Sequence, residues 1–139
     1  MINHQKGVSL INILIIVIVV GIIIGGGFLL LNNERSKTRD AKRMSDIVRI
    51  QAAFEFLYNN TASYEFAAVG GCESVGNLVS QCNLSKYMPT IAAIKDPGKF
   101  SYIVSTVPTE DDYQITFTLE NSYDSYAAGQ HVVSPAGIQ

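Results

Sequence analysis

Two cysteines are the first candidates for chemistry in this sequence. Cys72 and Cys82 lie ten positions apart in a segment rich in glycine, serine and asparagine. Thiols at this spacing can form a disulfide that closes a small loop, as is typical of domains in an oxidising compartment. A zinc site would need two further Cys or His ligands at short spacing, and the segment contains none. We therefore predict a disulfide between them, with two free thiols in a cytosolic domain as the alternative.

The other ionisable side chains form no catalytic motif. The two histidines, His4 and His131, are far apart, and His131 is expected on the surface of a strand. The acidic run Glu110–Asp112 could bind calcium, but the twelve-residue pattern of an EF-hand is missing and acidic turns are usually solvated. We therefore expect no enzymatic activity and no cofactor.

A cluster of charge lies between Glu34 and Arg49, with six basic residues and three acids. Phosphate binding needs clustered Lys and Arg, so this is the one candidate for DNA binding. The interspersed acids neutralise part of the charge, and contacts with neighbouring protein could take up the rest, so a DNA site is not favoured. The spacing of Lys42, Asp46 and Arg49 predicts ion pairs on the outer face of that helix, each worth about 0.2–0.5 kcal/mol.

The elements that position these side chains begin with an apolar segment. Residues 8–31 carry no charge and are polar only at Ser9 and Asn12. About 20 apolar residues can span a bilayer as a helix, whereas a cleaved secretory signal has an apolar core of roughly 7–15 residues and a small-residue site after it. We predict a retained membrane helix. The basic residues, one before the span and six after it, would place the C-terminal part in the cytoplasm, in conflict with the predicted disulfide.

The helix is predicted to continue past the apolar segment. Apolar residues recur at three- and four-residue steps from Ile47 to Tyr58, the period of an amphipathic helix. Asn59–Thr61 predicts its end, because Asn tolerates the left-handed conformation found there. Four glycines interrupt the apolar half and indicate either close helix packing or a segment that can unwind. They are Gly21, Gly25, Gly26 and Gly27.

A small sheet is predicted in the C-terminal part. Residues 99–107 and 111–120 are expected to be strands, the second with clear alternation, and residues 131–134 a third. A short helix is expected around Val75–Met88. Because a three-stranded sheet needs a cover for its apolar face, we expect the helix to supply it, with Phe54 and Leu57 as anchors. The predicted fold is α+β: a long N-terminal helix packed on an antiparallel sheet of about three strands.

The N-terminal sequence KGVSLINILIIVIVVGIIIGGG, from Lys6 to Gly27, resembles the start of type IV pilins and type II secretion pseudopilins. In that family a short basic leader ends in Gly and precedes a hydrophobic residue, Thr or Ser, and Leu-Ile. The segment from Arg39 to Tyr64 also resembles the second half of the long pilin helix. The resemblance covers about the first sixty residues in detail and the globular half only in outline.

The resemblance implies a processing site. A prepilin peptidase would cut between Gly7 and Val8, and the new amine of Val8 would be methylated. Gly21 matches a glycine common in the family, in a region that can lose helical structure inside filaments, which favours the unwinding interpretation of the glycines. The family's topology, with the leader in the cytoplasm and the domain outside, overrides the count of basic residues and agrees with the disulfide.

Asn12 departs from the family pattern. Four residues after Val8 the family normally has Glu, which is thought to pair with the N-terminal ammonium of a neighbouring subunit. A buried charge among apolar helices needs such a partner. Asn can accept a hydrogen bond from an ammonium but lacks the strength that a carboxylate adds. The alternative is that Asn12 bonds between packed helices, as polar residues in membrane helices often do.

The resemblance therefore implies a structural pilin subunit that polymerises with copies of itself. Residues 1–7 would be the leader, 8–31 the membrane and filament-core half of the helix, 32–60 its amphipathic half and 61–139 the globular domain. The subunit would meet the prepilin peptidase and assembly machinery in the cytoplasmic membrane and end in an extracellular or periplasmic filament. The alternatives are a pseudopilin of a secretion or DNA-uptake machine and an unprocessed single-pass membrane protein with a small extracytoplasmic binding domain.

Overall fold

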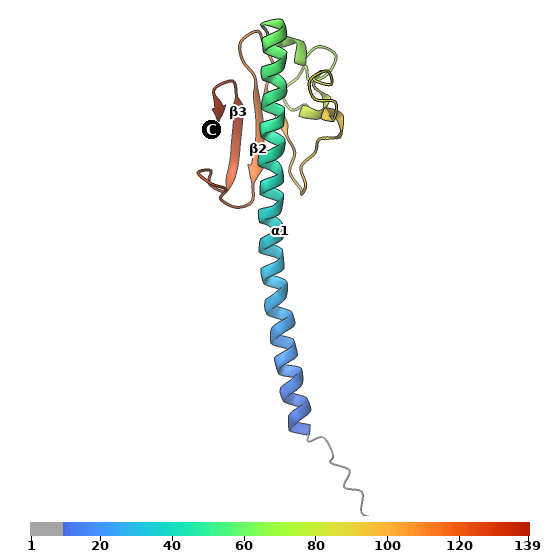
Figure 1. Ribbon diagram of the computed structural model, residues 1–139, viewed down its shortest axis with the longest axis vertical. Helices are drawn as coiled ribbons and strands as arrows, with labels where there is room; N and C mark the ends of the chain where they lie inside the picture. Colours follow the sequence, from blue (N-terminus) through green and yellow to red (C-terminus); the bar gives the residue numbers. More distant parts are fainter. Residues whose placement is uncertain (1–9) are drawn as a thin grey trace, which may run out of the picture. The chain divides into compact units, whose positions relative to one another are not determined.

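The computed structural model describes residues 10–139, apart from the side chains of residues 28–30 (Figure 1). Compact packing divides the chain after Arg35 into two units, of which the second comprises Ser36–Gln139. One helix, α1, runs from Leu10 to Thr61. The predicted leader and the processing junction at Gly7 and Val8 lie outside the described residues.

The part of α1 in the first unit exposes the apolar side chains that the structure describes there, from Leu10 to Ile24 and at Leu31. α1 is the one helix among the described residues that is long and apolar enough to cross a membrane, by length and composition. None of its most apolar stretch is buried by the described residues. A helix hydrophobic all round is suited to lipid or to the interior of an assembly. This finding fits a membrane span or a signal sequence, and it confirms the predicted long apolar helix.

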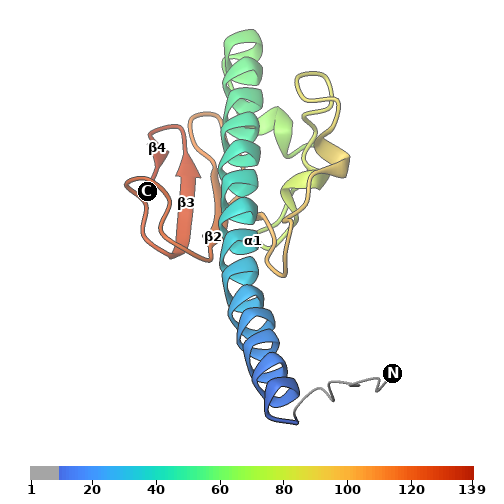
Figure 2. The same ribbon diagram turned by 60° about the horizontal axis from the view of Figure 1, so that its bottom comes forward.

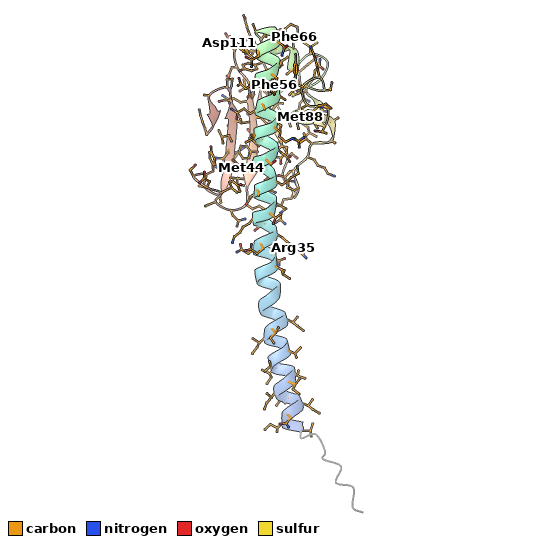
Figure 3. All side chains as sticks on the ribbon, in the orientation of Figure 1. Arg35, Met44, Phe56, Phe66, Met88 and Asp111 are labelled. Atoms are coloured by element: carbon orange, nitrogen blue, oxygen red, sulfur yellow. A yellow bond between two sulfur atoms is a disulfide. The ribbon has the colours of Figure 1, made fainter. Side chains whose placement is uncertain are left out.

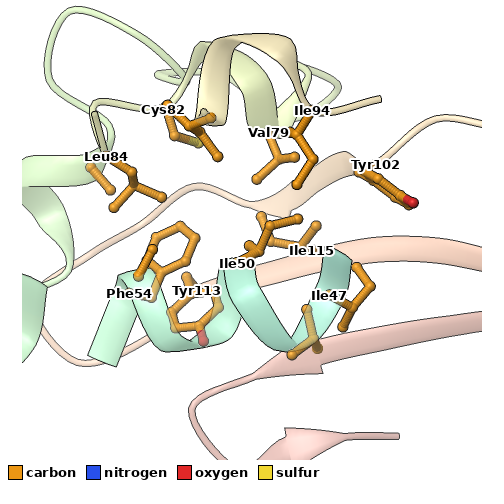
Figure 4. Packing of buried hydrophobic residues seen from close by; sticks show 14 of the residues in the cluster. Ile47, Ile50, Phe54, Val79, Cys82, Leu84, Ile94, Tyr102, Tyr113 and Ile115 are labelled. Atoms are coloured by element: carbon orange, nitrogen blue, oxygen red, sulfur yellow. The ribbon is translucent and has the colours of Figure 1, made fainter. Parts of the chain in front are cut away.

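In the second unit α1 is amphipathic. Ile47, Ile50, Phe54 and Leu57 are all buried, at three- and four-residue steps. Figure 4 shows the first three among residues from the sheet and the loops. The Phe54 ring stacks on that of Tyr113, with centroids 3.9 Å apart. The predicted stripe and its two anchors are therefore confirmed as core.

The sheet has four antiparallel strands in the order β1-β2-β3-β4. They span Ile103–Thr106, Gln114–Leu119, Gly129–Ser134 and Gly137–Ile138. The alternation expected in β2 is present, since Ile115, Phe117 and Leu119 are buried. The fold class is confirmed as α+β, with one strand more than the three expected. β4 has only two residues, too few for a periodic signal, and pairs with β3 through a tight turn.

The sheet and the loop-rich segment lie on different sides of α1 (Figures 1 and 2). The loops contain three short 3-10 helices: Glu65–Ala67, Val79–Gln81 and Ile91–Ala93. The helix predicted over Val75–Met88 is wrong. The amides of Gly76 and Val79 donate instead to the carbonyls of Val104 and Tyr102, so this backbone extends along the edge strand β1. Gly76 also has φ +94°, which a helix cannot contain.

The end of α1 at Thr61 agrees with the predicted end, but another residue makes the turn. Ala62, with φ 54°, takes the left-handed conformation expected of an asparagine. Its amide donates to the Tyr58 carbonyl at 2.7 Å. The Asn60 and Thr61 side chains donate to the carbonyls of Phe56 and Leu57. These bonds satisfy carbonyls that the helix end would otherwise leave unpaired.

Candidate assembly site

The exposed apolar half of α1 is the first component of a candidate assembly site. Its large side chains are between 45% and 85% exposed, a degree that soluble surfaces rarely show over a contiguous stretch. These residues are Leu10, Ile11, Ile13, Leu14, Ile15, Ile16, Val17, Ile18, Val19, Val20, Ile22, Ile23 and Ile24. Asn12 is exposed among them, as the only polar side chain of this stretch. Such a surface is suited to burial in lipid or against another apolar surface. Asn12 is its one described side chain that can form a hydrogen bond.

The four glycines of the apolar half lie within the helix. A Cβ added at Gly21, Gly25, Gly26 or Gly27 would meet nothing within 4 Å. Packing among the described residues therefore does not require glycine at these positions. Close approach by another helix and a capacity to unwind both remain predictions.

A buried charge cluster in the second unit fastens α1 to two distant loops. The Arg43 side chain is fully buried, and its Nε and Nη2 donate to the two carboxylate oxygens of Asp96 at 2.5 and 2.9 Å. Its Nη1 donates to Asp40 Oδ1 at 2.7 Å and lies 2.8 Å from Glu120 Oε1. Arg39 forms a bidentate ion pair with Glu120, in which its Nε and Nη2 donate to Oε1 and Oε2 at 2.7 and 2.5 Å. This cluster joins α1 to the turn before β1 and to the end of β2.

The backbone of the two loops also contributes to the charge cluster. The backbone amides of Glu120 and Asn121 donate to the Asp40 carboxylate at 2.9 and 2.8 Å. A Cβ on Gly98 would lie 2.8 Å from Arg43 Nη2, so the Asp96-Pro97-Gly98 turn needs glycine there to approach the arginine. The cluster therefore depends on backbone as well as side chains.

The same contacts keep the acids ionised. The hydrogen bond from Arg39, with help from Arg43, lowers the pKa of Glu120 from 4.5 to about 2. Burial alone would raise the pKa of Asp40 and Asp96, but the hydrogen bonds that they accept outweigh it and lower both pKa values. Contact with Asp96 raises the pKa of Arg43 further above its usual value. A buried charge is tolerated only with such complete pairing.

Asp46 forms a second buried contact, next to the first. Its carboxylate accepts a hydrogen bond from the Tyr102 hydroxyl at 3.1 Å and pairs with Lys42, while Arg49 lies 4.0 Å away. The predicted pairing partners are correct, but the prediction that Asp46 lies on the outer face is wrong, because its side chain is fully buried. Burial, reinforced by Asp46, raises the pKa of Tyr102. Asp46 turns inward because the Tyr102 hydroxyl needs a buried acceptor.

The disulfide between Cys72 and Cys82 is confirmed. Both residues are buried in the same hydrophobic core as α1 and the sheet. Gly71 lies so close to the carbonyl of Gln81 that a Cβ would be 2.0 Å from that oxygen. The bridge and this close approach hold the loop segment against the core.

The acidic run at residues 110–112 makes no metal site in the described part of the chain. No group of three or more His, Cys, Asp or Glu side chains is arranged there to hold a metal ion. Glu110 and Asp111 are exposed. The amide of Tyr64, just after α1, donates to the Glu110 carbonyl at 3.2 Å, which places the acidic run beside the end of the helix.

Sequence reasoning missed the buried charge cluster. It counted Arg39 and Arg43 in a basic cluster and predicted no buried partners for them, whereas Arg43 is buried and its guanidinium also lies 5.1 Å from the centre of the Phe100 ring. One local signal existed, since Asp40 and Arg43 are three residues apart on the helix. The partners Asp96 and Glu120 lie 53 and 77 positions further along the sequence and gave no local signal.

No family model, curated protein or solved structure matches this chain. The architecture itself is pilin-like: a long apolar N-terminal helix followed by a small antiparallel sheet, with a disulfide in the same domain.

Proposed function

We propose that this chain is a structural subunit that polymerises through the apolar half of α1 into a type IV pilus-like filament. The observation that carries the proposal is the exposed apolar surface from Leu10 to Ile24, polar only at Asn12 and not covered by described residues of the chain. Such a surface must be buried in lipid or against copies of itself. A subunit that is stored in a membrane and then assembled uses both environments in turn.

The second unit supplies the folded part of the subunit. Its core, disulfide and buried charge cluster join the amphipathic half of α1 to the sheet and to the loops of the same unit. The disulfide supports placement of this domain in an oxidising compartment outside the cytoplasm. The proposed role is structural and requires no catalytic chemistry.

Processing and assembly belong to the same proposal. A prepilin peptidase would cleave between Gly7 and Val8 and leave a methylated amine on Val8. The neutral Asn12 would then offer that amine a hydrogen-bond acceptor in place of a carboxylate. Filament cohesion would depend mainly on apolar packing, and the glycines from Gly21 to Gly27 would allow the helix to adapt to its neighbours.

Mass spectrometry of the protein purified from its native membranes tests the processing step. An N-terminus at Val8 that carries a methyl group is expected, and an intact Met1 would overturn it in favour of an unprocessed single-pass protein. Electron microscopy of cells that express the chain tests polymerisation. Long surface filaments that contain the chain are expected. Short periplasmic assemblies would indicate a pseudopilin. The absence of both kinds of assembly would overturn the filament role.

A further inference from the structure

A basic hollow lies on the surface of the second unit, beside α1. It encloses about 280 Å³, and its polar lining includes Lys42, Arg49, Thr90 and Lys95, with Asp46 and Asp96. The side chains of Lys42 and Arg49 are about half exposed, and Lys95 is exposed. The hollow is large enough for a few carboxyl-bearing side chains, and its cations reach solvent.

The charges of the hollow do not cancel. The Asp96 carboxylate pairs with Arg43 in the buried cluster, whose two arginines and three carboxylates leave a net charge of −1 beside the hollow. The Asp46 carboxylate can balance only one of the three cations that surround it, and it is already shared between Lys42 and Arg49. Lys95 makes no hydrogen bond or ion pair with any described residue. The three cations and Asp46 sum to +2, and the adjoining cluster subtracts one, so one positive charge remains without compensation in this concave site, which concentrates its field.

An acidic surface lies at the other end of the same unit. Glu110, Asp111 and Asp112 follow one another beside the end of α1, and none of them forms an ion pair with a described residue. The carbonyl end of α1 adds partial negative charge, and its last turn contains no basic residue. Burial raises the pKa of the nearby Tyr64, and Glu55 and Asp111 add to the shift, in keeping with unneutralised negative charge.

The two surfaces cannot meet within one chain. Figure 3 shows Asp111 beside the end of α1 and Met44, two residues from Lys42, near the opposite end of the unit. From Lys42 and Arg49 to Thr61 the helix rises roughly 18–28 Å at 1.5 Å per residue. This distance exceeds the screening length of about 8 Å at physiological ionic strength. Neither surface is therefore neutralised by the other in an isolated subunit.

We infer that the acidic run Glu110–Asp112 of one copy docks into the basic hollow of Lys42, Arg49 and Lys95 on the next copy. The contact joins different surfaces of two identical chains, so it leaves both a free acidic run and a free hollow at the ends of any pair. Contacts of this head-to-tail kind build open helical assemblies when the rotation does not close a ring. The inference rests on the proposed filament function and adds the second contact between subunits, made by the folded unit and not by the apolar helix.

Zero-length carbodiimide cross-linking tests the contact directly. The reagent forms an amide between a carboxylate and a lysine amine with no spacer, so it links only groups in direct contact, and the distance between the two surfaces within one chain excludes an internal product. We expect mass spectrometry of the treated, full-length protein in cell envelopes to detect Lys95 or Lys42 linked to residues 110–112. Absence of these linked peptides in envelopes that contain the filaments would overturn the contact and leave the filament function intact. Absence of filaments would overturn the filament function, whatever the cross-linking result.

A charge-swap series tests whether the contact matters for assembly. Lys95→Glu and Asp111→Lys should each reduce the filament yield at least several-fold, because each places like charges in contact. The double variant should recover most of the lost yield, since it restores an opposite pair. Lys86→Glu is the matched control, because this exposed lysine lies outside the hollow, and its yield should not change. Equal yields in all variants, or a double variant worse than both singles, would overturn the inference. Equal thermal unfolding in detergent would show that the variants remain folded.

Discussion

The two halves of α1 differ in where their apolar surface is buried. From Leu10 to Ile24 every large side chain is exposed, whereas from Met44 to Leu57 one stripe is almost completely buried. The same kind of hydrogen-bonded backbone supports both. In the second half the apolar stripe is buried by packing within the domain, and this burial stabilises the fold. In the first half the surface is left for lipid or for another copy, so its stability depends on what surrounds it.

The halves also differ in their charges. The described apolar half has none, whereas the amphipathic half contributes Arg39, Asp40 and Arg43 to a charge cluster in which Arg43 and Asp40 are as buried as the core. Buried charges fix geometry because each hydrogen bond has a direction, whereas apolar contacts tolerate sliding. This contrast predicts that substitutions of buried residues in the second half will destabilise the domain and that substitutions in the first half will change only assembly.

Removal of Arg43 should have the largest effect on stability. Arg43→Ala leaves Asp40 and Asp96 buried without their partner, so the free energy of unfolding of the second unit should fall by about 3–5 kcal/mol. Urea unfolding of the full chain in detergent, followed by near-ultraviolet circular dichroism of the tyrosines, measures this change. Arg35→Ala is the control, because this arginine is exposed, and should change the free energy by less than about 0.5 kcal/mol. A loss below about 1 kcal/mol in Arg43→Ala would show that the cluster does not stabilise the domain.

Two phenylalanines two positions apart test the buried stripe. Phe54 is fully buried against Tyr113, and Phe56 is 58% exposed on the same helix. Phe54→Ala should cost about 3–4 kcal/mol through lost burial and the cavity that remains. Phe56→Ala should cost less than about 0.5 kcal/mol in the same urea experiment. Similar losses in the two variants would contradict the assignment of the stripe.

Loss of the disulfide should have a smaller effect. Cys72→Ser together with Cys82→Ser should lower the free energy of unfolding by about 2–3 kcal/mol, since the bridge closes a short loop and restricts the unfolded chain. The comparison of oxidised and reduced wild-type protein gives an independent measurement without substitution. A double variant as stable as the wild type would show that core packing alone holds this loop.

Much of this fold follows from two periodicities that the sequence displays. Steps of three and four residues predicted the buried stripe of α1, and alternation predicted the buried side chains of β2, because both patterns arise from local backbone geometry. The Cys pair predicted the disulfide from spacing and composition alone.

The errors have one physical cause in common, which is a partner far away in the sequence. Residues 75–88 have local features of a helix, but the neighbouring edge of β1 offers hydrogen bonds that extend the chain at Gly76 and Val79. Arg43 and Asp46 have the composition of a solvated helix face. They are buried because Asp96 and Tyr102, more than fifty residues away, supply an ion-pair partner to Arg43 and a hydrogen-bond donor to Asp46. A local pattern contains no information about such contacts.

Acid should weaken the second unit through the same carboxylates. The pKa of Glu120 is about 2 in the folded protein against 4.5 in an unfolded chain, and the pKa values of Asp40 and Asp96 are also lowered. The folded state therefore binds fewer protons than the unfolded state between these values. Its extra stability is present above about pH 4.5 and declines as the pH falls toward 2. Urea midpoints should be level from pH 7 to 5 and then fall, and Glu120→Gln should have a shallower decline. A level profile down to pH 2 would show that these acids do not contribute.

The smallest effect on stability should come from substitution of Asn12, because this residue lies in the half of α1 that does not pack in the folded domain. Asn12 is exposed within the apolar half, so Asn12→Glu should change the free energy of unfolding of the second unit by less than about 0.5 kcal/mol. Its effect should fall on assembly. A carboxylate would bind the amine of a processed neighbour more strongly than an amide does, at a greater cost of placement in the bilayer. Filament yield in electron micrographs should therefore increase if charge pairing limits assembly, with Asn12→Gln as the neutral control. An unchanged or reduced yield with equal membrane levels would show that apolar packing along α1 is sufficient, and that the amide at this position suits the filament as it is.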